Sequence, residues 1–403
     1  MKITDGVYWV GVNDTQTKLF EALWSLSRGV SYNSYLILGS EKKALIDTVN
    51  KDFSEEYIRG LRRLIDPEDL DYIVLNHVEP DHAGSLSKIL SVASKASVVG
   101  MANGIEFVRK YHRVPFNDIV VKDGVTIDLG GKTLRFIETP CIHWPETMCT
   151  YLAEDGIMFS GDLFGSFGAI GDQIFDDRFD EVFKNEAKRY FAAVLSPYAA
   201  FVNRAIKKFD TLDTPIRVIA PSHGLIYKEN PSEIKNLYAE LSSGKFEEKV
   251  VIVYGSMYGN TETLAEAVAK GVRDRGVRGV IFNISYSEPG DVLSEIWRAP
   301  AVAVGSPVYD SFIFPPITNL LELIKLKRIK QRVFGLFGNY TWGGGPFKQL
   351  ERSIQGLGSE IVGTFVEAQG SPIPSNIQEA EELGNILADA AIQRVKETSG
   401  SAP

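Results

Sequence analysis

The sequence predicts two α/β domains in series, a layered sandwich followed by a doubly wound parallel sheet. In residues 1 to about 245, short β-rich runs bounded by Gly, Asp and Pro are interrupted by helical stretches, which is typical of a layered α/β sandwich. In residues 249–397, strand and helix patterns alternate five times, as in a doubly wound sheet. The segment between them, "LSSGKFEEK" (241–249), is small, polar and charged, and it predicts a linker. We therefore expect one domain at 1–245 and a second at 249–397.

The elements of the first domain follow from its apolar runs and their turn residues. The expected strands lie in 6–12, 34–39, 43–49, 72–76, 97–101, 118–124, 132–140, 156–162 and 217–224. Helical patterns cover 53–65 and a long run from about Glu181 to Phe209.

The second domain shows a stricter alternation. Its expected strands are 249–254, 279–285, 301–306, 332–338 and 360–366, and its expected helices are 261–276, 291–298, 316–325, 346–357 and 377–397. The first of these strands, "KVVIVY", is a continuous apolar run, as expected for a strand that is buried on both faces.

Composition narrows the class of protein. The chain has 403 residues, and its net charge of −9 argues against a nucleic-acid-binding surface. The start, "MKITDGVYWVGVND", has no basic segment before an apolar core, and no apolar run approaches the length of a membrane span. We therefore expect a soluble, cytoplasmic protein that binds neither nucleic acid nor a membrane. Two cysteines, Cys141 and Cys149, cannot build a disulfide framework or a four-cysteine metal module.

The stretch "NHVEPDHAGS" (76–85) places two histidines and two acids within six positions, just after an expected strand. Later β-like runs are followed by "CIHWPE", "FSGDLF" and "APSHG". The candidate metal ligands are His77, Glu79, Asp81, His82, His143, Asp162 and His223. Imidazole and carboxylate ligands suit zinc or iron better than magnesium. Singly, His143 or His223 could equally be a surface or capping residue, but that reading does not explain the whole set. His112 has no acid beside it and is expected to be structural.

The charge of this ligand set favours one metal. Glu79, Asp81 and Asp162 are three anionic ligands beside four histidines. Two divalent ions would bring four positive charges, which three carboxylates and a bridging hydroxide would cancel. Harder, more anionic ligation favours iron that cycles between ferrous and ferric over inert zinc.

A second group of candidate site residues lies in the C-terminal half. "YGSMYGNTE" (254–262) follows a strand and opens a helix, so its hydroxyls and N–H groups could hold a phosphate. A plain turn would explain this stretch equally well, but 305–316 and 337–345 also follow strands whose ends should converge on one crevice. The candidate cofactor contacts are Ser256, Met257, Tyr258, Gly259, Asn260, Thr261, Ser306, Pro307, Val308, Tyr309, Asn339, Tyr340, Thr341, Trp342, Gly343 and Gly344.

These motifs carry a family resemblance. The order His-x-x-x-Asp-His, then His, Asp and His on later strands, resembles the metallo-β-lactamase fold, whose zinc hydrolases carry His-x-His-x-Asp-His. Here Glu79 takes the second position. "SMYGNT" resembles the flavodoxin phosphate loop, Ser/Thr-x-Thr-Gly-x-Thr, with Tyr258 in the middle. Together the halves resemble the flavodiiron proteins, or A-type flavoproteins, over nearly the whole chain.

The resemblance implies a metallo-β-lactamase-like αββα sandwich followed by a flavodoxin-like doubly wound parallel sheet. It implies FMN in the second domain and two irons in the first. One iron would take His77, Glu79 and His143, the other would take Asp81, His82 and His223, and Asp162 would bridge them. The sequence departs from the common family pattern at Thr341, where many members have Gly, and at Glu21, where many have His.

The resemblance also implies an activity. FMN would pass electrons to a diiron centre that reduces dioxygen to water, nitric oxide to nitrous oxide, or both. A head-to-tail homodimer, or a dimer of such dimers, would bring the two cofactors of different subunits close together. The external donor would be a rubredoxin or a reduced deazaflavin coenzyme. Two alternatives stay open: a zinc hydrolase with an accessory flavodoxin domain, and an electron-carrying flavoprotein whose metal site is structural.

Overall fold

The structure is a computed structural model that describes residues 1–342 and 346–400, so the predicted contacts Gly343 and Gly344 lie outside the described residues. The chain divides into two compact units. The first comprises Met1–Phe191 and Tyr198–Ser242, and the second comprises Ala192–Pro197 and the residues from Ser243 onward. The unit boundary falls inside the predicted linker, because helix α7 (Pro231–Ser242) runs into that segment and strand β17 (Lys249–Tyr254) begins at its end.

The first unit contains two main sheets. The larger has the order β1-β2-β7-β8-β9-β10-β11, with antiparallel pairing from β1 to β8 and parallel pairing from β8 to β11. Its strands are β1 (Lys2–Thr4), β2 (Val7–Trp9), β7 (Tyr35–Leu38), β8 (Lys43–Ile46), β9 (Tyr72–Val74), β10 (Ser97–Met101) and β11 (Asn117–Val121). Two short hairpin-like pairs accompany it: β3 (Val12–Asp14) with β6 (Val30–Tyr32), and β4 (Leu19–Phe20) with β5 (Trp24–Ser25).

The second sheet of this unit has the order β12-β13-β14-β15-β16. Its strands are β12 (Thr126–Asp128), β13 (Thr133–Glu138), β14 (Met148–Leu152), β15 (Ile157–Gly161) and β16 (Val218–Pro221). The sequence prediction missed β14, whose five residues are all buried. A strand buried on both faces lacks the alternation of apolar and polar residues that reveals a half-exposed strand.

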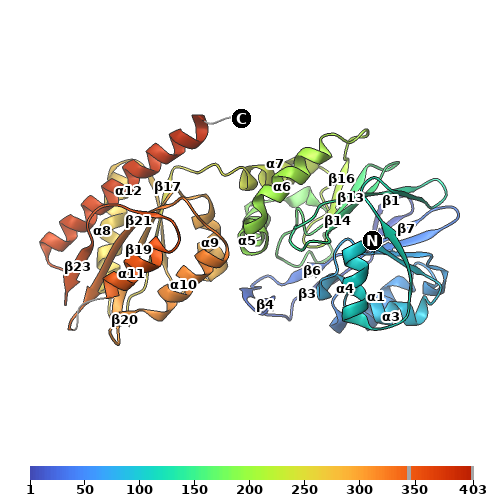
Figure 1. Cartoon of the computed structure of the whole chain (residues 1–403), viewed down its shortest axis with the longest axis horizontal. Helices are drawn as coiled ribbons and strands as arrows, with labels where there is room; N and C mark the ends of the chain where they lie inside the picture. The colour runs from blue at the N-terminus through green and yellow to red at the C-terminus, as the bar shows by residue number, and fades with distance from the viewer. Residues whose placement is uncertain (343–345, 401–403) are drawn as a thin grey trace. The chain divides into compact units, whose positions relative to one another are not determined.

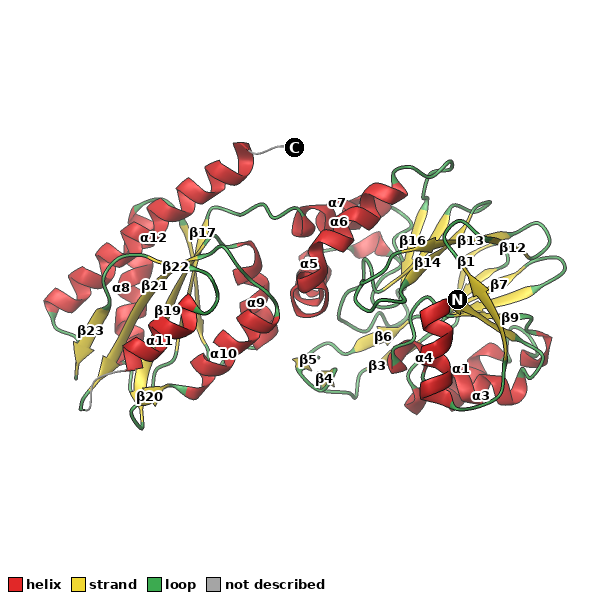
Figure 2. Cartoon of the chain, viewed as in Figure 1, coloured by secondary structure: helices red, strands yellow, loops and turns green. Residues whose placement is uncertain are grey.

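The two sheets form the middle of the sandwich. The ring of Tyr35 on β7 lies 5.0 Å from that of Phe159 on β15, so the inner faces are in contact. The helices lie outside, with α1, α3 and α4 on one side and α6 and α7 beside the second sheet (Figure 2). The helices of this unit are α1 (Ser54–Leu61), α2 (Pro80–Ala83), α3 (Leu86–Val92), α4 (Ala102–His112), α5 (Glu181–Tyr190), α6 (Ala199–Phe209) and α7. The predicted αββα sandwich is confirmed.

The predicted helical run from about Glu181 to Phe209 is helical throughout, but it is not one α-helix. Helix α5 ends at Tyr190, a π-helical turn covers Phe191–Leu195, a 3₁₀ turn covers Ser196–Tyr198, and α6 starts at Ala199. Pro197 has no N–H to donate, and its ring clashes with the preceding turn of an α-helix, so a continuous helix is excluded.

The second unit is built on one parallel sheet of order β18-β17-β19-β21-β22, with β23 also paired to β21. Figure 1 labels β17, β19, β21 and β23 of this sheet. The strands are β17, β18 (Arg278–Asn283), β19 (Ala301–Tyr309), β20 (Phe312–Ile313), β21 (Val333–Tyr340), β22 (Glu360–Ile361) and β23 (Val366–Gln369). The helices are α8 (Asn260–Asp274), α9 (Pro289–Arg298), α10 (Pro315–Leu326), α11 (Pro346–Gln355) and α12 (Pro374–Gly400). This is the flavodoxin strand order, second-first-third-fourth-fifth.

Two predicted segments of this unit have a different structure. Residues 305–309 continue β19, because Gly305 to Pro307 pair with β21 before the chain turns back into β20. That turn consists of Asp310 and Ser311, both with positive φ, as in a tight type I′ hairpin. The predicted last strand is divided into β22 and β23, with Gly363 at φ +71° between them.

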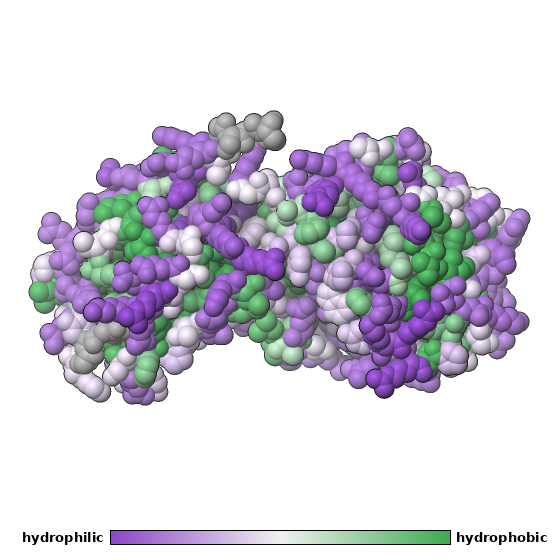
Figure 3. Space-filling view, in the orientation of Figure 1, coloured by the Kyte–Doolittle hydropathy of each residue, from purple (hydrophilic) through white to green (hydrophobic). Residues whose placement is uncertain are grey.

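Hydrophilic side chains predominate on the face of the molecule drawn in Figure 3, with smaller hydrophobic areas among them. Within residues 1–342 and 346–400, no helix combines the length and apolar character needed to cross a bilayer.

Candidate metal centre and flavin site

The seven predicted metal ligands come from the ends of strands in both sheets of the first unit. His77 follows β9, Glu79 immediately precedes the short helix α2, and this helix carries Asp81 and His82. The second sheet contributes the other three ligands, from the β13–β14 connection, the end of β15 and the end of β16; these are His143, Asp162 and His223. Parallel neighbours such as β15 and β16 end at the same edge, which brings their following residues together.

One group of ligand atoms gathers around Glu79. Its Oε2 lies 3.2 Å from Nε2 of His77 and 2.9 Å from Nε2 of His143. Oδ2 of Asp162 lies 3.6 Å and 3.4 Å from the same two nitrogens. The four residues offer ligand atoms that all lie within 4.8 Å of one another.

A second group adjoins the first. Asp81 lies between two histidines, with Oδ1 3.3 Å from Nε2 of His82 and Oδ2 3.3 Å from Nε2 of His223. Oδ1 of Asp162 lies 3.0 Å and 3.5 Å from these nitrogens. Asp162 therefore turns one oxygen toward each group. Each sequence-predicted ligand is in one of the two groups, whereas His112 lies outside both and contacts Ser87 at 2.9 Å.

The hydrogen-bond partners of these buried atoms, or their absence, show whether the atoms suit a metal. Both carboxylate oxygens of Asp81, Oδ1 of Asp162, and Nε2 of His82 and His223 are buried and have no hydrogen-bond partner among the described residues. Buried polar atoms are costly unless they are satisfied. Four imidazoles and three carboxylates that converge with several of their buried atoms unpartnered are satisfied by cations, and the donor set fits two iron or zinc ions.

The electrostatics of the site also favour positive charge. Burial by itself would lower the pKa of His77, but hydrogen bonds to Glu146 and Glu79 outweigh it and raise the pKa to about 10. Burial would likewise lower the pKa of His143, but hydrogen bonds to Asp162 and Glu79 outweigh it and raise the pKa to about 10. Burial would raise the pKa of Asp162, but the histidines hold it well below its usual range. The pocket therefore stabilises cations and carboxylate anions together.

Residues around the ligands hold them in place. Nδ1 of His77 contacts Glu146 at 2.7 Å, and Nδ1 of His223 contacts the backbone oxygen of Ser31 at 2.8 Å. Asp47, at the end of β8, accepts a bond from the N–H of Asn76, and burial raises its pKa to about 6. Sequence reasoning did not identify Asp47, although it follows an apolar strand as the ligands do.

Asn76 connects the two sheets beside the metal ligands. Its side-chain amide donates to the oxygen of Phe159 on β15 and accepts from the hydroxyl of Thr150 on β14. Its backbone oxygen accepts from the N–H of Met148. The loop that starts at His77 is therefore anchored to both sheets.

Two hollows reach the metal ligands from outside. One, of about 320 Å³, is lined by the β4–β5 hairpin, including Glu21, and by Glu79 and Asp81. The other, of about 430 Å³, is largely aromatic and is lined by Phe107, Tyr111, His143, Trp144, Pro145 and Tyr198. The ring of Trp144 lies edge-on to His77, 5.2 Å away. The two groups of candidate ligands are thus reached by hollows with different linings.

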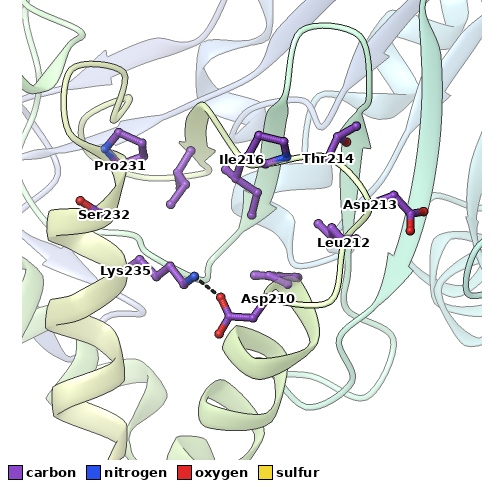
Figure 4. Close-up of a pocket in the computed structure, with 11 residues that line it drawn as sticks. Asp210, Leu212, Asp213, Thr214, Ile216, Pro231, Ser232 and Lys235 are labelled. Atoms are coloured by element: carbon purple, nitrogen blue, oxygen red, sulfur yellow. Dashed lines mark hydrogen bonds and ion pairs between the residues drawn. The ribbon is translucent and has the colours of Figure 1, made fainter.

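A third hollow, of about 480 Å³, lies where α6 ends and α7 begins (Figure 4). Lys235 points across it to Asp210, with which it forms an ion pair. Among the described residues that line it there is no predicted metal ligand or flavin contact. We therefore do not assign the site to it.

In the second unit, the predicted phosphate loop lies between β17 and α8. Gly259 has φ +90° and immediately precedes the first residue of α8, and its N–H donates to the hydroxyl of Ser256. Thr261 is buried, whereas Met257 and Tyr258 are exposed. The loop thus presents backbone N–H groups at a helix N-terminus, which suits a terminal phosphate.

The neighbouring strand ends carry exposed aromatic rings. Tyr309 is 45% exposed, Trp342 72% and Tyr258 89%, all near the ends of β17, β19 and β21. Large exposed rings at one sheet edge fit a flat cofactor.

Two predicted contacts have other roles: the hydroxyl of Ser306 accepts from the N–H of Phe314, and the amide of Asn339 holds the oxygens of Ala368 and Gly370. Pro307 and Val308 lie in β19, and Tyr340 lies at the end of β21. Asn260 starts α8, and Thr341 accepts a bond from Gln369.

Comparison with known proteins places these observations in a family. Residues 30–224 match the model of the ODP family beta lactamase, and residues 252–384 match flavodoxin. The chain is 36% identical to a nitric oxide reductase of Moorella thermoacetica, over 96% of this chain and 97% of that protein. It is 35% identical to an anaerobic nitric oxide reductase flavorubredoxin of Escherichia coli O1:K1, over 96% of this chain and 81% of that protein.

Solved structures agree with these relatives. The rubredoxin oxygen:oxidoreductase of Desulfovibrio gigas superimposes with a TM-score of 0.93 at 30% identity, covering 98% of this chain and 99% of that one. The flavodiiron protein of Giardia intestinalis gives 0.93 at 27% identity, covering 100% and 98%. The fold and site define an oxidoreductase with a metallo-β-lactamase-like domain and a flavodoxin-like domain. The chain belongs to the flavodiiron protein family.

Proposed function

We propose that this chain reduces nitric oxide, dioxygen or both at a pair of irons, with FMN as the point where electrons enter. The observation that carries the proposal is the arrangement of Asp162, which turns one oxygen toward each of two ligand groups. The relatives bear the names nitric oxide reductase and rubredoxin oxygen:oxidoreductase, so both gases are candidate substrates. When bound, the irons supply a gas-binding redox centre and the flavin supplies electrons to it.

The ligand assignment follows from the two groups. We assign His77, Glu79 and His143 to one ion, and we assign the second group to the other. That second group is Asp81, His82 and His223, and Asp162 is shared between the ions. The three carboxylates hold two cations at short separation by offsetting their charge. Glu146 and the oxygen of Ser31 orient the histidines through their other ring nitrogens.

The flavin assignment rests on the second unit. We assign the phosphate of FMN to the Ser256–Thr261 loop and the flat ring to the edge that carries Tyr309 and Trp342. The exposed aromatic rings give the flavin a stacking surface. Gly343 and Gly344 were predicted as part of this site, and that assignment stays a prediction.

Electron delivery favours a head-to-tail dimer. The aromatic hollow beside His143 is open, and Tyr111 at its rim is 53% exposed. We propose that the flavin edge of a second copy lies against this hollow, because Trp144 joins it to His77. Sedimentation of the loaded protein should show a dimer, and full activity in a monomer would contradict this arrangement. The external donor is a rubredoxin or a reduced deazaflavin coenzyme.

The decisive experiment combines metal analysis, flavin analysis and gas consumption on one anaerobic preparation. We expect two irons and one FMN per chain, together with consumption of nitric oxide, dioxygen or both when a reductant is supplied. Glu79→Gln should abolish gas consumption and keep the flavin. Zinc that fills both sites after growth with ample iron, together with hydrolytic activity, would overturn the proposal.

A further inference from the structure

His77 is held by a buried carboxylate from a distant part of the chain. Oε1 of Glu146 lies 2.7 Å from Nδ1 of His77, and each side chain is 1% exposed. The same oxygen accepts the backbone N–H of Val78 at 3.2 Å. Nε2 of His77 faces Glu79 and Asp162. With Nε2 turned to the metal ligands, Nδ1 is the nitrogen that carries hydrogen and donates to Glu146.

The carboxylate of Glu146 is buried and few partners compensate it among the described residues. Among the described residues, its ion pair is with His77, and its second oxygen, Oε2, is buried without a hydrogen-bond partner. A buried carboxylate is costly unless its charge is compensated. The interaction with His77 therefore accounts for the presence of this charge.

The two histidines of the second ligand group are held differently. Nδ1 of His223 contacts a neutral backbone oxygen, that of Ser31, at 2.8 Å. Nδ1 of His82 is buried without a partner among the described residues. A hydrogen bond to an anion is roughly twice as strong as one to a neutral acceptor. His77 in the first ligand group is thus held by a stronger hydrogen bond than His223 or His82 in the second.

Helix α4 leaves room for the stem of this carboxylate. A Cβ added at Gly104 would lie 3.4 Å from Cγ of Glu146 and 3.5 Å from Cγ2 of Val78. Glu146 is thus packed from one side and bonded from the other, so its carboxylate has little freedom to leave Nδ1 of His77.

We infer that Glu146 is a positioning residue that fixes His77 with Nε2 toward the metal and strengthens it as a ligand, so that the two metals are held unequally. The ion bound by His77, Glu79 and His143 is the one that depends on Glu146. This inference rests on the proposed function in taking both ligand groups to bind metal. It concerns metal affinity, and it is separable from which gas is reduced.

Two variants with side chains close in size to Glu separate the hydrogen bond that orients His77 from the packing of residue 146. Glu146→Gln keeps an oxygen acceptor for Nδ1 and loses the charge. Glu146→Leu keeps bulk and loses the acceptor. Metal-free, FMN-containing protein is titrated anaerobically with Co²⁺. In the wild type we expect two tight sites. In Glu146→Leu, affinity at one site should fall about 10- to 100-fold while the other site is unchanged, and Glu146→Gln should lie between.

A spectroscopic readout identifies the affected site. In the Co²⁺-loaded protein, a protected ring N–H beside the metal gives a shifted proton NMR signal that disappears when its proton exchanges quickly with water. The signal of His77 should be present in the wild type, retained in Glu146→Gln and lost in Glu146→Leu. The signal of His223 should persist in all three, because its acceptor is a backbone oxygen.

The matched control is Asp176→Asn, which changes a buried carboxylate outside both ligand groups. Asp176 accepts the backbone N–H groups of Lys228, Glu229 and Asn230. This variant should lose stability and keep both Co²⁺ affinities. Wild-type affinity in Glu146→Leu, or an equal loss at both sites, would overturn the inference. If the Co²⁺ results hold but the iron-loaded wild type reduces neither gas, the proposed function fails and the role of Glu146 stands.

Discussion

Oδ1 of Asp162 lies 3.0 Å from Nε2 of His82, and each side chain is 1% exposed. The contact joins the end of β15 to helix α2, and hence the two sheets of the sandwich. The other oxygen of Asp162 faces the opposite ligand group. One carboxylate thus belongs to both halves of the centre, and its removal should affect both.

Asp162→Asn should leave the chain unable to hold two metals tightly. The amide keeps one oxygen but removes the charge that is shared between the two groups, so iron content should fall to one ion or fewer per chain. The rate of reduction of either gas should fall at least about 100-fold. Replacing a residue that only hydrogen-bonds to a metal ligand already lowers metal affinity or activity about 10- to 100-fold. The FMN content, measured by absorbance after denaturation, should stay unchanged. Two irons in the variant would contradict the shared role of Asp162.

The two histidines of the second group should differ in importance. His223→Ala removes a ring fixed by the oxygen of Ser31, whereas His82→Ala removes a ring whose Nδ1 has no partner among the described residues. A ligand oriented in advance loses less freedom on binding metal, so it contributes more affinity. Titration with Co²⁺ should therefore show a larger loss for His223→Ala. A larger loss for His82→Ala would show that orientation by Ser31 is unimportant.

The phosphate loop predicts a matched pair of glycine variants. Gly259 and Gly276 both have positive φ, +90° and +76°, with no atoms within 4 Å of an added Cβ. Alanine at either position therefore costs about 1 kcal/mol or more of backbone strain. They lie at opposite ends of α8. Gly259→Ala should weaken FMN binding about tenfold, as measured by fluorescence titration of the flavin-free protein, whereas Gly276→Ala should lower stability alone. Equal FMN affinity in both variants would remove this loop from the proposed site.

The buried thiol of Cys149 should make stability depend on pH in the alkaline range. Burial raises its pKa to about 12, above the ordinary value of 9.0. A folded-state pKa above the unfolded one means that the stabilising contribution is complete below pH 9 and is lost as the pH rises toward 12. By pH 10 the loss is about 1.4 kcal/mol.

Denaturant unfolding of the metal-free chain at pH 8 and pH 10 measures this effect. The fall in the free energy of unfolding should be smaller in Cys149→Ala than in the wild type by about 1.4 kcal/mol. Cys141→Ala is the matched control, because Cys141 is only partly buried. The same fall in the wild type and in Cys149→Ala would contradict the prediction.

The gathering of the candidate metal ligands could be predicted from sequence because each follows an apolar strand, and strand ends converge in α/β folds. The contact of Glu146 with His77 could not be predicted, because nothing near Glu146 in the chain indicates this partner. The interruption at Pro197 was visible in the sequence, yet the apolar pattern on both sides hid it. The extension of β19 through Tyr309 depends on pairing with β20 and β21, which local pattern does not contain.

The candidate ligands of each ion come from both layers of the sandwich, one set after β9 and the other from the β13–β14 connection and the ends of β15 and β16. Each bound ion would therefore cross-link two layers that otherwise meet through side-chain packing and the hydrogen bonds of Asn76. A chain that lacks metal would lose these cross-links and have less to hold the layers together. Iron supply would then set the lifetime of the protein, since the unloaded chain opens more often and is more readily degraded by proteases.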